Sequence, residues 1–143
     1  MHAKVTERLR EVTQTHAPPS RTAVIGYWIC TLFVAMPALV AGAMDVLHLQ
    51  PLFGLLVHLG YPAYFATLLG IWKVLGAIVL LAPRTPLIKE WAYAGMVIDY
   101  SSAVLSHAAS GDGAGAIAGP ALSLVALAAS WYLRPCARRL PQV

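Results

Sequence analysis

Long apolar segments separated by short polar ones dominate the chain from residue 22 to residue 133. Four of these segments are about 20 residues long, the length at which a helix crosses the hydrocarbon core of a bilayer. We therefore predict an all-α membrane protein with a four-transmembrane-helix bundle as residues 22–135. The expected spans are about 22–44, 63–82, 88–108 and 114–133.

Two polar tails flank the predicted bundle, residues 1–21 and the basic residues 136–143. Nine of the ten Lys and Arg residues lie in these tails, at residue 134, and in residues 83–90 around the turn between the second and third spans. Cytoplasmic loops of membrane proteins carry such an excess of cations. Both termini are therefore predicted to be cytoplasmic, and we expect a multi-pass protein of the cell membrane, with the bacterial inner membrane as its location.

The composition agrees with this class. Hydrophobic residues make up 59% of the chain and charged residues 11%, whereas a soluble domain has about 25% charged residues. The net charge of +4 is accounted for by the distribution of cations, so nucleic-acid binding is not indicated.

Small and polar residues recur at helical spacing within the spans and predict the faces that pack against other helices. Glycine and serine on the first, third and fourth spans are expected to let backbones approach closely inside the bundle; they are Gly42, Gly95, Gly119, Ser123 and Ser130. The predicted inner face of the first span consists of Tyr27, Thr31, Val34, Ala38, Gly42 and Asp45.

Lys73 lies near the middle of the second span, about 15 Å from either end at 1.5 Å per residue. An ammonium at that depth costs about 3 kcal/mol or more unless it has a partner. Asp99 has the opposite sign and a matching depth in the third span, so we predict a direct or water-mediated contact between the two, with Ser102 and Ser106 nearby. The pair could fix the register of the helices or form a functional polar site, and the sequence favours neither.

A second group of polar residues is predicted to gather at the opposite membrane face from the termini: Asp45, His48, His58 and His107. Histidine titrates near neutral pH and often binds metals. No spacing typical of a metal site joins these residues, however, so we favour solvated interfacial side chains and predict no metal site. Cys30 and Cys136 do not form a CxxC motif, which argues against a catalytic dithiol.

Several short motifs between residues 58 and 112 resemble the DoxX-like family of small four-span membrane proteins. They are HLGYP (58–62), LGIWKVLG (69–76), KEWAYAG (89–95) and SH (106–107). The resemblance implies a four-span fold. It also implies relatives in redox and stress-response membrane complexes, because the family name comes from relatives of a thiosulfate:quinone oxidoreductase subunit.

Two classes of function remain open. One is a redox- or quinone-linked membrane subunit that binds a small ligand near Lys73 and Asp99, with quinone as the expected cofactor and a membrane redox protein as partner. The other is a non-catalytic carrier, channel or scaffold protein. Either could act in the lipid bilayer as a homo-oligomer, and the sequence does not decide whether anything is turned over.

Overall fold

The computed structural model describes residues 20–135, 138 and 139, and these residues form five helices and no strands. The helices are α2 (Arg21–Val46), α3 (Leu52–His58), α4 (Ala63–Leu81), α5 (Pro86–Ala109) and α6 (Ala114–Tyr132). The ends of α2, α4, α5 and α6 lie within two residues of the predicted spans. The predicted tails lie outside the described residues, apart from residues 20, 21, 138 and 139, and so does Cys136.

Three helices, α2, α4 and α6, are long and apolar enough to cross a membrane. The fourth predicted span, α5, is long enough but does not reach the same hydropathy, since it carries Lys89, Glu90 and Asp99 among tyrosines and serines. The part of the chain that the structure describes is therefore all-helical, with three helices of membrane-spanning character. Four spans and cytoplasmic termini stay predictions.

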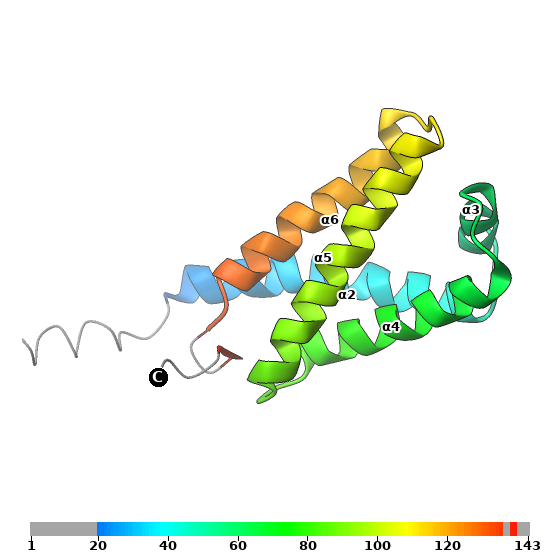
Figure 1. Ribbon diagram of the computed structural model, residues 1–143. Coiled ribbons are helices and arrows are strands. Elements are labelled where there is room, and N and C mark those ends of the chain that lie inside the picture. Colours follow the sequence, from blue (N-terminus) through cyan, green and yellow to red (C-terminus); the bar gives the residue numbers. More distant parts are fainter. Residues whose placement is uncertain (1–19, 136–137, 140–143) are drawn as a thin grey trace, which may run out of the picture.

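The four long helices form two pairs, α2 with α4 and α5 with α6, and the pairs also meet through α2 with α6 and α4 with α5. Figure 1 shows the pairs meeting near the α4–α5 turn and spreading apart toward the short helix α3. We call these the closed end and the α3 end. The core lies between the pairs and consists of Val34, Ala35, Ala38, Ala77, Leu80, Tyr93, Met96 and Leu127.

The inner face predicted for the first span is confirmed. All six of its members, from Tyr27 to Asp45, are buried in α2. Gly42 marks the closest approach of α2 to α4, because a Cβ atom added there would lie 2.7 Å from the carbonyl oxygen of Gly70. Only glycine on both helices permits backbones to touch in this way.

The prediction of close packing is wrong for two other glycines. A Cβ atom added at Gly95 or at Gly119 would meet no atom within 4 Å. Of the two predicted serines, Ser130 is buried and Ser123 only partly so. A small side chain is compatible with both a tight helix crossing and an open space, and the sequence does not distinguish the two.

Lys89 ties the closed end together. Its side chain is fully buried, and Nζ donates hydrogen bonds to the carbonyl oxygens of Val79 (2.5 Å), Leu80 (2.9 Å) and Ala82 (2.5 Å). The last carbonyls of a helix lack partners within the helix and carry its partial negative charge. The ammonium of α5 therefore caps the end of α4 and fixes the angle at which the two helices diverge.

Candidate functional site

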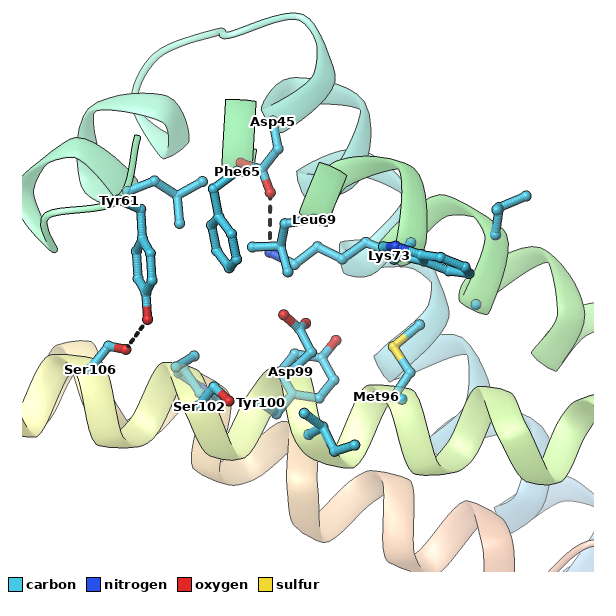
Figure 2. Close-up of a pocket in the computed structure, with 18 of the residues that line it drawn as sticks. Asp45, Tyr61, Phe65, Leu69, Lys73, Met96, Asp99, Tyr100, Ser102 and Ser106 are labelled. Atoms are coloured by element: carbon cyan, nitrogen blue, oxygen red, sulfur yellow. Dashed lines mark hydrogen bonds and ion pairs between the residues drawn. The ribbon is translucent and has the colours of Figure 1, made fainter. Parts of the chain in front are cut away.

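A cavity of about 760 Å³ occupies the space between the diverging helices. Its walls are α4 on one side and α5 on the other, with leucines of α3 at the α3 end, and most of its lining is apolar. The lining also includes His107, Tyr61 and Tyr100, but the carboxyl and amino groups in it are three: Asp45, Lys73 and Asp99. All three were predicted as polar-site candidates, and Figure 2 shows them facing the same space.

Lys73 pairs with Asp45. Its Nζ donates to Asp45 Oδ2 across 3.1 Å, and the side chains retain only 18% and 2% of their exposure. The close crossing at Gly42 and Gly70 explains the pair, because it brings the end of α2 against the middle of α4. The sequence predicted that Asp45 closes its span at the far end. The structure shows that its side chain also lines the cavity.

Asp99 extends from α5 into the same cavity, opposite the Lys73–Asp45 pair (Figure 2). Its carboxyl group makes no hydrogen bond or ion pair with any residue that the structure describes. The prediction of a direct contact between Lys73 and Asp99 is therefore wrong, whereas a water-mediated contact stays a prediction, because both residues line one cavity. Lys73 is satisfied from α2, which leaves Asp99 as the free acceptor of the site.

Ser102 and Ser106 continue the Asp99 face of α5 and also line the cavity, in agreement with their predicted place near Asp99. Ser106 Oγ lies 2.7 Å from the hydroxyl oxygen of Tyr61, so a hydrogen bond joins α5 to the start of α4. Tyr61 follows Gly60, whose φ of 85° is readily adopted only by glycine. This turn brings the tyrosine over the cavity and accounts for the HLGYP motif.

The predicted group of outer polar residues is divided in the structure. His48 bonds to Thr67 Oγ1 (2.9 Å), while His58 and His107 share Asp112. Within residues 20–135, no three His, Cys, Asp or Glu side chains are placed to hold a metal ion.

Asp112 accepts one hydrogen bond on each carboxylate oxygen. His107 Nδ1 lies 2.7 Å from Oδ2, and His58 Nε2 lies 3.0 Å from Oδ1. These hydrogen bonds, that from His107 first, lower the pKa of Asp112 below its ordinary value. Sequence reasoning missed both Asp112 and Tyr61; the only signal was that HLGYP and SH stand out in the chain without an evident role.

Helix α3 covers the cavity at this end without being embedded in the protein. None of its seven residues is buried, and Leu52, Leu55 and Leu56 line the cavity. The His58–Asp112 hydrogen bond joins α3 to the loop between α5 and α6, and the Tyr61–Ser106 bond joins the turn after α3 to α5. Few buried contacts and two polar attachments are typical of a segment that opens locally.

A family model described as the DoxX-like family matches residues 29–130. No curated protein and no solved structure matches the chain. The matched region begins in α2 and ends in α6, so it contains every residue of the cavity, the Lys73–Asp45 pair and the α3 attachments. The match covers more than half of the sequence, and the chain therefore belongs to the DoxX-like family.

Proposed function

We propose that this protein binds a small quinone-like ligand in the cavity between α4 and α5, as a redox-linked subunit of the bacterial inner membrane. The observation that supports this most is the combination of an apolar cavity with the charged groups of Lys73, Asp45 and Asp99 at one place in its wall. Ligand sites typically have volumes of about 300–1,000 Å³, an apolar lining and a few convergent polar groups. The cavity of about 760 Å³ has all three properties.

The mouth of the cavity suits a ligand that arrives from the bilayer. Three large apolar side chains line the cavity and are also exposed on the outside of the helices: Trp72 (65%), Trp91 (76%) and Ile98 (66%). In a membrane these side chains face lipid. A hydrophobic molecule dissolved in the bilayer can therefore enter between α4 and α5 without passing through water.

The inner part of the cavity suits an aromatic ring with oxygen substituents. Phe65 and Tyr100 offer flat apolar surfaces on opposite sides of the space between Lys73 and Asp99 (Figure 2). The ammonium of Lys73 has three N–H donors, and Asp45 is the only side chain that it contacts within hydrogen-bonding distance among the described residues. A ligand oxygen can accept a further hydrogen bond. Electrons would pass between the bound ligand and a membrane redox partner.

Tryptophan fluorescence in lipid nanodiscs tests the proposal, because Trp72 and Trp91 line the cavity whereas Trp28 and Trp131 do not. Titration with decylubiquinone should give saturable quenching in the native protein. The double variant Trp72→Phe/Trp91→Phe retains the two remote tryptophans and should show only the linear quenching that a membrane-dissolved quinone produces. Equal, non-saturable quenching in both proteins would contradict the proposal.

A cavity-filling variant provides a second test with a matched control. Gly95 lines the cavity and has open space around it, so Gly95→Leu should fold normally and occupy part of the site. Its quinone affinity should fall by about tenfold, which corresponds to about 1.4 kcal/mol. Gly115→Leu changes a glycine that also has open space but lies outside the cavity, and its affinity should be unchanged.

A further inference from the structure

We infer that Asp99 makes the cavity selective for ligands whose head group donates a hydrogen bond, so that the protein binds the reduced quinol in preference to the oxidised quinone. This inference rests on the proposed function and adds the redox form of the ligand. It follows from how hydrogen-bonding capacity is distributed in the cavity wall.

The cavity has two carboxylates and one ammonium, and the ammonium is already engaged. Lys73 Nζ donates to Asp45 Oδ2 (3.1 Å), and Asp45 is only 1% exposed. This pair is compensated within the protein. Asp99 is therefore the carboxyl group of the cavity that has no ion-pair partner within 4 Å among the described residues.

Three hydroxyl groups that line the cavity together with Asp99 are committed elsewhere. Tyr100 OH donates to the carbonyl oxygen of Val34 at 3.5 Å, and Tyr61 OH and Ser106 Oγ bond to each other at 2.7 Å. Ser102, three residues after Asp99, lines the cavity and belongs to the same face of α5. Asp99 is thus presented to the cavity with both oxygens free of the donors that the structure describes.

An ionised carboxylate only accepts hydrogen bonds. Leaving such a group unpaired in an apolar site is costly, and a ligand that supplies a donor removes that cost. A quinone head group offers carbonyl acceptors alone, which would face Asp99 with like partial charge. A quinol offers two hydroxyl donors, one of which can bond to Asp99 while its oxygen accepts from Lys73.

The arrangement of side chains in Figure 2 would let one ligand hydroxyl meet both demands at once. Asp99 points from α5 toward the opposite wall, where the Lys73–Asp45 bond and the ring of Phe65 lie. A hydroxyl group in the gap between Asp99 and Lys73 would have an acceptor on one side and a donor on the other. A site built to bond a ligand hydroxyl rejects an analogue that lacks it.

The test compares the affinities of matched ligands for the native protein in nanodiscs under argon. Each ligand competes with a bound fluorescent probe, whose displacement is followed through the tryptophans of the cavity. Decylubiquinol should bind at least about tenfold more tightly than decylubiquinone, the factor that corresponds to about 1.4 kcal/mol. A second pair of ligands, which cannot undergo this redox change, isolates the effect of the hydroxyl donor. Of these, 4-nonylphenol should bind more tightly than 4-nonylanisole, in which a methyl ether replaces the hydroxyl. These comparisons need no variant and so do not depend on its folding.

The variant Asp99→Asn then assigns the preference to one residue. Asparagine presents an amide donor as well as an acceptor, so the ratio of quinol to quinone affinity should fall to about one or reverse, while Gly115→Leu should keep the native ratio. Equal affinities in the native protein, tighter binding of the quinone, or a preference that persists in Asp99→Asn would each overturn the inference and leave the proposed function standing. Absence of saturable binding by either form would instead refute the proposed function.

Discussion

Removal of Lys73 should strand the carboxylate of Asp45 and destabilise the protein strongly. Asp45 is only 1% exposed, and Lys73 Nζ is its only hydrogen-bond or ion-pair partner among the side chains that the structure describes. Lys73→Met keeps the apolar stem and deletes the ammonium. Breaking a buried ion pair by removing one partner costs about 3–5 kcal/mol, and we expect a loss of that size.

The opposite change should cost less. Asp45→Asn keeps an oxygen that can accept from Lys73, whose side chain lines the cavity and is 18% exposed. We expect a loss of about 1–3 kcal/mol, the usual penalty for a buried group that loses a good partner. The double variant Lys73→Met/Asp45→Asn should recover part of the loss, with a coupling free energy of about 2 kcal/mol, within the range found for residues in contact.

The assay is reversible unfolding in mixed detergent micelles, which gives the unfolding free energies of the Lys73→Met and Asp45→Asn double-mutant cycle. A second double-mutant cycle serves as the control. That cycle combines Lys73→Met with Asp99→Asn, the partner that depth along the sequence suggested. The structure predicts strong coupling to Asp45 and weaker coupling to Asp99, which shares the cavity without a direct bond. Stronger coupling to Asp99 than to Asp45 would refute the reasoning.

Three further predictions concern the scaffold. Gly42→Leu should lower the unfolding free energy by about 3 kcal/mol through overpacking against α4, whereas Gly115→Leu should leave it unchanged within the error of a thermal melt. Lys89→Met should remove the donor shared by three carbonyl oxygens at the end of α4, and a loss below about 1 kcal/mol in the same melt would contradict this capping role. The lowered pKa of Asp112 means that its hydrogen bonds stabilise the native state above the ordinary carboxyl pKa of about 3.9 and are lost as the pH falls through the lower native value. Stability should therefore fall less steeply below about pH 5 in Asp112→Asn than in the native protein, and equal slopes would speak against the hydrogen bonds.

Periodicity along the chain predicted the helices and the buried face of α2, because these features depend on residues close in sequence. Tyr27, Thr31 and Asp45 share a helical face whatever packs against it, and the structure buries that face. The presence of Lys73 and Asp99 in one polar region was likewise predictable, because the two residues lie at matching depths along their predicted spans. Each is a charged residue near the middle of an apolar segment.

The partner of Lys73 was not predictable, because it depends on the crossing of two helices. Gly42 and Gly70 touch, and this contact carries the end of α2 toward the middle of α4. Depth along each span contains no information on such a crossing. Gly95 was misassigned for a related reason, since the sequence does not show that Lys89 caps α4 and holds α5 at an angle that leaves a cavity beside Gly95.

Photoaffinity labelling tests the central claim most directly. An azidoquinone is irradiated with the protein in nanodiscs, and the labelled peptides are identified by mass spectrometry. The account predicts labelling within residues 63–81 and 86–109, on side chains that line the cavity, and suppression of that labelling by excess decylubiquinol. Labelling confined to the exposed face of α6, at residues such as Leu122 and Val125, or labelling that excess quinol does not reduce, would contradict it.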